Sequence, residues 1–414
     1  MPRALVLLIS LALTLPAAEY DRRVAEVTRT PGFAAFWDFV KREPAANGTP
    51  RFDAHKPKRE SADLRLDAVN YVLDYWNEGR PATYADFPLL NEGPFGQAIQ
   101  IRNETDAAFR PVLLVPRARL HDSGIDAKGP ARGVSLVVWL KRESGNHAMA
   151  GIWHEGTDLH GAAGLAKRVE LGRRQYALFA GLAANTAGVG AHVSENGGKS
   201  FGDRYARNLS VTPDRLTANW DVAAFAFDNA KDTVTSYLNG EAKDYWIDDP
   251  AKHPFFQWPA RGWLQAQLAA MPGEQPGEDP AFPRDQFYSP PEGKPLRRTR
   301  VSESATHRVE LHEFAFTKVR VTLTHGPSGR FREIVSRELM SLRANPFWFA
   351  HDLYSPDGID NGGPFTIGRV IHSSRSVGLT GWIGGVAVFT RALDAKHMRR
   401  LAAIAAQGNI KLTE

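Results

Sequence analysis

The chain has 414 residues, of which 43% are hydrophobic and 23% are charged, and this composition excludes a disordered polymer. Thirty-six glycines and 27 prolines favour turns and short strands, so a helical bundle is not the expected fold. The net charge is only +5, and no segment has the Lys and Arg density of a nucleic-acid-binding arm, so we expect no nucleic-acid partner. Because cysteine is absent, disulfides, zinc–thiolate sites and cysteine nucleophiles are excluded.

Residues 1–18 have the pattern of a secretory signal peptide. Arg3 supplies the positive charge, residues 4–15 form the apolar core, and Ala17 and Ala18 are the small residues expected before a cleavage point. A buried strand or helix is the alternative. No later apolar run reaches the roughly 18 residues that a membrane span needs. We therefore expect a secreted or periplasmic protein that is soluble after processing and has no membrane span.

Residues 19–84 give weaker signals. Trp37-Asp38-Phe39 fits the first strand of a sheet, and the competing interpretation of 19–84 is a small extension or a separate N-terminal domain. The main domain is expected over residues 85–410.

Alternating hydrophobicity recurs along this main domain. In residues 134–141, Val134, Leu136, Val138 and Leu140 share one face, as in a strand that packs on a core. Residues 223–228 and 233–238 form a hairpin around the turn at 229–232. Further strands are predicted at 308–324, 365–371 and 382–389. Consecutive strands with few helices predict an all-β fold, a two-sheet antiparallel β-sandwich.

The sandwich is interrupted by an insertion at about 246–345, which we expect to be loop-rich. Residues 272–280 are Pro, Gly and acidic, and this composition cannot hold a ladder of backbone hydrogen bonds. The basic run at 297–300 is expected to be a solvated loop. The insertion has too many aromatic rings to leave in water, so we expect it to fold back over one sheet and narrow the groove.

Helical patterning is strong only near the C-terminus, where a short helix is predicted. Asp394 is a good N-cap, Leu393 precedes it and is expected to contact Met398, and Leu401 continues the apolar stripe.

The order and spacing of four stretches, at 91–101, 134–141, 220–240 and 364–393, carry a resemblance to a known superfamily. They are similar to the opening strand, the next core strand, the hairpin and the closing strands with terminal helix of concanavalin A-like lectins and glucanases. Within that superfamily the chain most resembles the laminin-G-like jelly-roll modules of secreted bacterial proteins. The resemblance implies a jelly roll whose concave face holds a carbohydrate or a protein.

Catalytic patterns are weak. The superfamily's glucanases use Glu-x-Asp-x-Glu on one strand, and no such string occurs here. Glu310 and His312 share a strand face, but an exposed edge strand explains them equally well. We therefore expect a non-catalytic module that recognises a glycan or an extracellular protein. The alternatives are a glycan-cleaving hydrolase or lyase, and a structural or adhesive envelope protein.

Calcium is the one cofactor that the resemblance leaves open. The family's last strand commonly reads Gly-x-Ile-Asp, whereas this chain has Gly384 in place of the aspartate, so we expect no calcium requirement at that strand. An oxygen-rich loop after the opening strand offers weak metal candidates, with a polar turn as the alternative. These candidates are Asn103, Glu104 and Asp106.

Three groups of side chains are candidates for ligand binding. The densest cluster of potential ligands follows a strand and is expected at a pocket mouth, two tryptophans offer stacking surfaces for sugar rings, and two basic residues offer hydrogen-bond donors. In that order they are Trp153, His154, Glu155, Asp158 and His160; Trp246 and Trp348; and Arg369 and His372.

Overall fold

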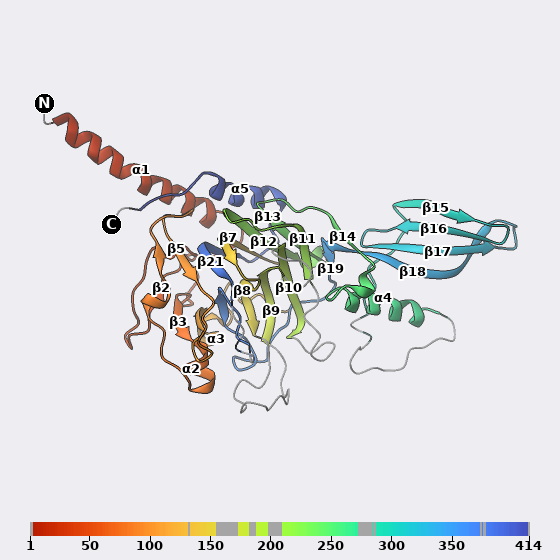
Figure 1. Cartoon of the computed structure of the whole chain (residues 1–414), viewed down its shortest axis with the longest axis horizontal. Coiled ribbons are helices and arrows are strands. Elements are labelled where there is room, and N and C mark those ends of the chain that lie inside the picture. The colour runs from red at the N-terminus through yellow and green to blue at the C-terminus, as the bar shows by residue number, and fades with distance from the viewer. Residues whose placement is uncertain are drawn as a thin grey trace.

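The computed structural model describes residues 3–130, 133–154, 173–181, 188–197, 209–271, 284, 287–372, 375 and 378–412, with side chains from residue 16 onward. Two antiparallel sheets pack face to face, and a third sheet projects from one end of this body (Figure 1). The predicted all-β sandwich is confirmed.

The first sheet, called sheet A, has the strand order β19-β13-β12-β7-β21-β5-β4, and β1 also pairs with β21. All its pairings are antiparallel. Its strands are β1 (Phe33–Trp37), β4 (Leu89–Leu90), β5 (Ala98–Ile101), β7 (Val134–Ser144), β12 (Trp220–Asp228), β13 (Thr233–Leu238), β19 (Phe347–Trp348) and β21 (Thr380–Phe389). The predicted first strand is thus shifted towards the N-terminus and ends at Trp37.

The second sheet, sheet B, has the order β11-β10-β9-β8-β20-β6-β3-β2. Its strands are β2 (Arg51–Phe52), β3 (Leu66–Asn70), β6 (Pro111–Val115), β8 (Ala148–His154), β9 (Arg173–Ala180), β10 (Gly188–Gly197), β11 (Leu209–Arg215) and β20 (Phe365–Ile367). The strand predicted at 365–371 ends at Ile367, because Gly368 takes a positive φ of 85° that ends the extended run. Residues 33–70 contribute strands to both sheets.

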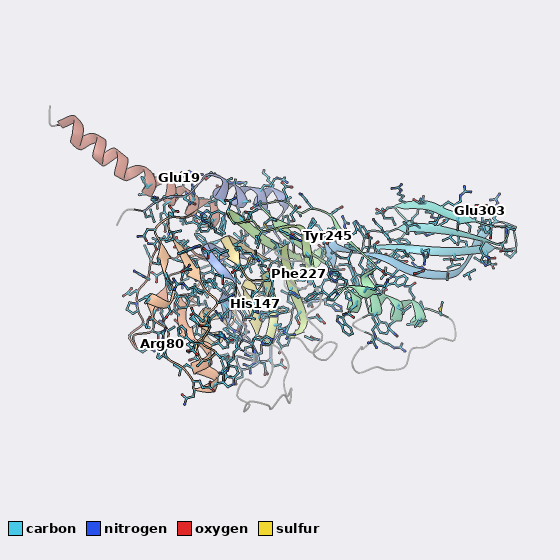
Figure 2. All side chains as sticks on the ribbon, in the orientation of Figure 1. Glu19, Arg80, His147, Phe227, Tyr245 and Glu303 are labelled. Carbon is cyan, nitrogen blue, oxygen red and sulfur yellow. The ribbon has the colours of Figure 1, made fainter. Side chains whose placement is uncertain are left out.

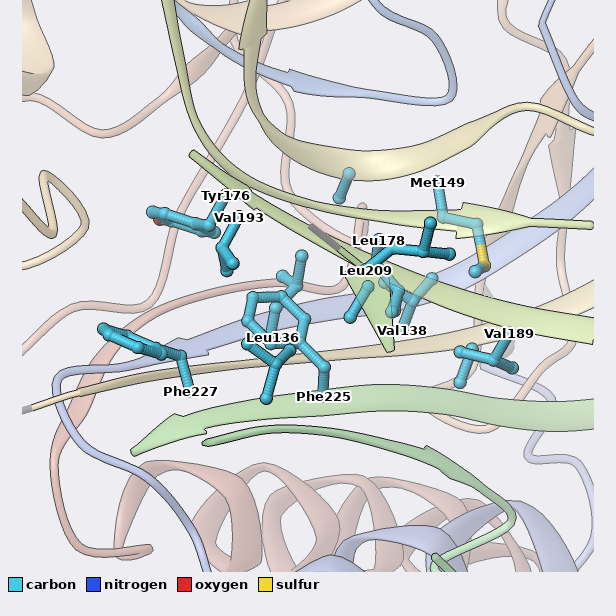
Figure 3. Packing of buried hydrophobic residues seen from close by; sticks show 14 of the residues in the cluster. Leu136, Val138, Met149, Tyr176, Leu178, Val189, Val193, Leu209, Phe225 and Phe227 are labelled. Atoms are coloured by element: carbon cyan, nitrogen blue, oxygen red, sulfur yellow. The ribbon is translucent and has the colours of Figure 1, made fainter. Parts of the chain in front are cut away.

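The core lies between the two sheets. Leu136 and Phe225 from sheet A face Tyr176 and Leu178 from sheet B, and all four are fully buried (Figure 3). The Tyr176 hydroxyl donates a hydrogen bond of 2.6 Å to the Ile125 carbonyl oxygen, so even the polar end of this ring is satisfied. Each buried large side chain stabilises the fold by about 1.5–3 kcal/mol.

Helices cover the outer faces of the sheets. Part of α1 (Arg3–Thr28) and α5 (Ala395–Ala406) pack on sheet A, where the Trp139 indole N–H donates to the Leu401 carbonyl at 3.1 Å. The predicted N-cap is confirmed, because the Asp394 carboxylate accepts from the His397 amide. The shorter helices are α2 (Tyr71–Trp76), α3 (Arg117–Leu120), η1 (Tyr84–Asp86), η3 (Asn229–Lys231) and η4 (Pro250–Lys252). Among the described residues, no helix is long and apolar enough to cross a membrane.

The insertion contains far more regular structure than the sequence predicted. It forms a five-stranded antiparallel sheet, in the order β14-β18-β17-β16-β15, and one helix. These elements are β14 (Tyr245–Asp248), α4 (Gln257–Ala269), β15 (Arg297–Glu303), β16 (His307–Glu313), β17 (Thr317–His325) and β18 (Phe331–Asn345). The expectation of a loop at 297–300 is therefore wrong: the run is the edge strand β15, and backbone pairing to β16 holds it extended.

Only part of the insertion folds back as predicted. Phe255, Phe256 and Trp263 are buried, and Trp258 packs on the outer face of sheet B. Strands β15 to β18 instead extend away from the sandwich as an arm, with Glu303 far from the core residue Phe227 (Figure 2). The arm can project from the sandwich because one face of its sheet is itself covered: Val319 and Val321 of β17 are buried.

Candidate functional site

The predicted cluster around Trp153 forms a closed group of rings. Trp153, at the end of β8, is only 2% exposed, and its ring lies 5.9 Å from Phe179 and 5.3 Å from His192. The Arg174 guanidinium lies 5.6 Å from the Trp153 ring centroid. His154 is also buried, and its ring lies 5.9 Å from Tyr75. Glu155, Asp158 and His160 lie outside the described residues. The described rings therefore pack on one another and offer no open stacking surface.

Arg369 and the 103–106 loop meet in space although more than 260 residues separate them. Arg369 is 1% exposed, its burial lowers its pKa to about 10, and its Nη2 donates to the Arg102 carbonyl at 2.9 Å. Nearby, Arg110 donates to the carbonyls of Glu104 and Asp106. A guanidinium therefore binds two backbone carbonyls of this loop.

The remaining predicted residues near Arg369 are Asn103, Asp106 and His372. Asn103 and Asp106 are exposed, and the Asp106 carboxylate accepts from the Ala108 amide at 2.8 Å, as in a polar turn. His372 is partly buried in the segment after Ile371. Within the part of the chain that the structure describes, no three His, Asp or Glu side chains gather as metal ligands.

Gly384, where the resembled family has a carboxylate, is a packing position. Strand β21 pairs Ile383 with Leu140 and Gly385 with Trp139 of β7, so Gly384 is the extra residue of a β-bulge. A Cβ atom built on Gly384 would lie 2.8 Å from Pro94 Cδ and 3.0 Å from Trp220 Cζ3. Because the contact with Pro94 is closer than real Cβ atoms show and the contact with Trp220 is tight, an aspartate would fit only if these neighbours moved.

Trp246 and Trp348 lie in different surroundings. Trp246, in β14, is partly exposed, with Lys318 Nζ 4.5 Å from its ring centroid and Arg343 Cζ 5.8 Å from it. Trp348 is also partly exposed and meets Tyr288 edge-on at 5.2 Å. Each ring contacts its own neighbours, and the two do not combine into one shelf.

A pocket inside the insertion combines an aromatic ring with polar side chains. The cavity, called the insertion pocket, has a volume of about 200 Å³ and lies between α4 and the segment that precedes β15. Its lining residues are Trp263, Gln267, Ser289, Pro290, Pro291 and Glu292. Sequence reasoning counted Trp263 among the aromatic residues but missed Gln267 and Glu292. The four-residue spacing of Trp263 and Gln267 would place them on one helical face. The helix itself was not predicted, because Pro259 and Gly262 within α4 both have low helix propensity.

Arg337, from β18, holds the polar side of the insertion pocket in place. Its Nη1 donates to Gln267 Oε1 at 2.5 Å, and its Nη2 donates to Glu292 Oε2. Its guanidinium carbon lies 5.6 Å from the Trp263 ring centroid. Two buried atoms, Trp263 Nε1 and Glu292 Oε1, have no hydrogen-bond partner among the described residues. The residues that line the pocket therefore include one unused donor, on an aromatic ring, and one unused acceptor.

Two larger hollows lie beside α1 and are less suited to a specific ligand. One, of about 440 Å³, is lined by charged residues of α1 and α5, and the other, of about 610 Å³, lies beside His55. Neither is lined by a buried aromatic ring. The insertion pocket is therefore the best candidate among the described cavities.

The fold defines an antiparallel β-sandwich with an inserted, projecting sheet, and comparisons with known proteins give remote similarities. No family model and no curated protein matches the chain. Domain 4 of AbnA, a GH43 extracellular arabinanase from Geobacillus stearothermophilus solved with arabinotriose, is similar at 10% identity and a TM-score of 0.33, over 76% of this chain and 81% of that chain.

Binding domains of botulinum neurotoxins are similar to a comparable degree. The serotype D/C domain matches at 7% identity and a TM-score of 0.36, over 90% of this chain, and this chain spans about half (52%) of that structure. A type C structure, described as interacting with two ganglioside molecules, matches at 6% identity and a TM-score of 0.32, over 88% of this chain and 51% of that one. Because these TM-scores lie below 0.5, a functional assignment depends on the chain's own residues.

Proposed function

We propose that this protein is a non-catalytic recognition module that binds a glycan at the insertion pocket. The observation that carries the proposal is that two residues lining one pocket, Trp263 and Glu292, have a buried indole N–H and a buried Oε1 without a partner in the described part of the chain. Leaving such groups unpaired costs about 1–3 kcal/mol each, and a ligand that pairs both recovers that cost.

The composition of the pocket fits a sugar. A sugar has C–H faces that pack on an indole and hydroxyls that both donate and accept hydrogen bonds. The volume of about 200 Å³ is smaller than the roughly 300 Å³ at which sites for drug-sized ligands begin. The pocket therefore suits a single sugar residue, such as the end of a longer glycan.

The same pocket favours binding over cleavage. Glycoside hydrolysis by the common mechanisms needs two carboxyl groups that flank the bond to be broken. Among the described lining residues Glu292 is the one carboxyl, and Arg337 holds it as an acceptor. A carboxylate held in this way can accept a hydrogen bond from a sugar hydroxyl. Hydrolysis would need a second carboxyl group, and none is among the described lining residues.

The proposal includes export of the chain. The apolar segment 4–15 lies in the part of α1 that points away from the body (Figure 1). From Glu19 onward the helix is anchored: Arg23 is buried and donates to the carbonyls of Pro94 and Gly408 at 2.8 and 2.7 Å. Removal of residues 1–18 would thus leave these anchoring contacts in place.

The test uses two conservative variants of the pocket and one matched control. A glycan array identifies a ligand, and calorimetry then measures its affinity for Trp263→Phe, which keeps a ring but removes the N–H, and for Glu292→Gln. Trp246→Phe makes the same change in a tryptophan outside the pocket. Losing the neutral hydrogen bond of the Trp263 N–H, at about 0.5–1.5 kcal/mol, weakens binding by about 2- to 12-fold. A bond to the Glu292 carboxylate is charge-assisted, so Glu292→Gln should weaken binding at least as much.

We expect both pocket variants to lose affinity and the Trp246→Phe protein to bind as the wild type does. Equal losses in the pocket and control variants would contradict the assignment of the site. Release of reducing ends or unsaturated products from a bound glycan would contradict the non-catalytic assignment.

A further inference from the structure

The strand β15 is an exposed edge of the projecting arm. All seven of its residues are exposed, and it pairs on one side with β16. Within the described residues no strand covers its other side. Such an edge presents a row of free backbone N–H and C=O groups, which is a template for another extended segment.

The arm is also where the charge of the protein is concentrated. Residues 297–345 contain ten Lys and Arg against five Glu and no Asp, so their net charge equals the +5 of the entire chain. On β15, Arg300 pairs with Glu303 at 3.0 Å. Arg297 and Arg298 are exposed and form no ion pair with any described residue.

Apolar side chains flank these arginines. Leu296 is 75% exposed and Val301 is 61% exposed, which makes them the two most exposed large hydrophobic residues of the described chain. Within the described chain, free backbone groups, guanidinium groups without an ion pair and the exposed side chain of Val301 thus lie along β15, and exposed Leu296 directly precedes it.

We propose that β15 is a docking edge to which an extended acidic segment of a partner protein adds as a further strand. Backbone hydrogen bonds would supply affinity, and carboxylates on the partner would pair with Arg297 and Arg298. This surface is separate from the insertion pocket, since no residue of β15 lines that cavity.

The observations favour this partner over two others. A second copy paired antiparallel along the full strand would place Arg300 opposite Arg300, which destabilises pairing, and would leave Arg298 opposite Ser302 without a carboxylate. An anionic glycan would satisfy the charge, but β15 carries no aromatic ring for stacking and a glycan has no backbone that matches the spacing of the strand's free groups. Figure 2 shows Glu303 on the projecting arm, and β15 is the terminal strand of that sheet.

The test measures binding of a fluorescent peptide in which glutamate alternates with valine, at physiological salt, to the intact protein. The double variant Arg297→Glu/Arg298→Glu is compared with Arg330→Glu/Arg332→Glu, which reverses two exposed arginines that lie outside β15 and form no ion pair with any described residue. A second peptide has the same charge but is N-methylated at alternate residues. It therefore lacks the backbone N–H donors needed for a ladder of hydrogen bonds with β15. Hydrogen exchange reports protection of the β15 amides.

We expect the β15 variant to bind at least tenfold more weakly, the control variant to bind within about twofold of wild type, and the β15 amides to become protected. The proposal is overturned if the first peptide does not bind, or if the N-methylated peptide binds equally well. It is also overturned if a sulfated oligosaccharide binds more tightly with the same dependence on Arg297 and Arg298, or if the protein dimerises through β15 instead.

Discussion

Gly384→Asp restores the carboxylate that the resembled family has at its last strand, and we expect it to destabilise the protein without creating a calcium site. The new Cβ would meet Pro94 Cδ at 2.8 Å and Trp220 Cζ3 at 3.0 Å. A proline ring held in a turn has little freedom to withdraw. Overpacking of this kind costs about 1–3 kcal/mol.

The carboxylate adds a second cost, because Gly384 is buried and its nearest neighbours are a proline ring and an indole. An unpaired polar group in such surroundings costs about 1–3 kcal/mol more. The two effects together predict a loss of about 2–6 kcal/mol. At about 2 °C for each kcal/mol, the melting temperature should fall by about 4–12 °C.

Thermal melts with chelator and with added calcium test this expectation. Gly384→Ala introduces the same Cβ without the charge, so its smaller loss isolates the steric cost. Calcium at about a hundred times its dissociation constant would add about 2.7 kcal/mol to any protein that binds it. The reasoning is refuted if Gly384→Asp melts at the wild-type temperature, or if calcium raises the melting temperature of either the variant or the wild type by several degrees.

Three further predictions concern stability. Asp394→Ala removes the N-cap of α5 and should cost about 1 kcal/mol in chemical denaturation, whereas Asp394→Asn, which keeps an acceptor, should cost less. Arg23→Ala leaves the buried Pro94 carbonyl, and the carbonyl of the exposed Gly408, without their donor and should cost about 2 kcal/mol, with no loss of cooperativity; a change below about 1 kcal/mol would contradict the anchoring role. The hydrogen bond from Arg80 lowers the pKa of Asp86 from 3.8 to about 2, so its stabilising effect is complete above pH 4 and disappears as the pH falls towards 2; Asp86→Asn should flatten acid unfolding over that interval.

The local pattern of the sequence was enough to predict the sandwich. Alternation in residues 134–141 identifies β7 because a strand with one face on a core must place every second side chain inward. The hairpin of β12 and β13 and the Asp394 cap are equally local, since each depends on residues a few positions apart. The same reasoning failed for α4 and β15. Proline and glycine interrupt the helical hydrophobic pattern of α4, and the charged residues of β15 show no alternation of apolar side chains, so pairing with β16 sets its extended conformation.

The candidate sites depend on contacts that no local pattern encodes. Arg337 reaches Gln267 and Glu292 from 70 and 45 residues away, and only the packing of β18 beside α4 brings them to one pocket. The ring of Trp153 looks like a ligand contact in the sequence but is covered in the fold, because periodicity specifies which face a side chain occupies and not what covers that face. The sequence by itself determined strands such as β7, β12 and β13 and their buried faces, since these follow from local backbone geometry. The tertiary structure decided which side chains meet and which edge stays open, since these follow from how distant segments pack.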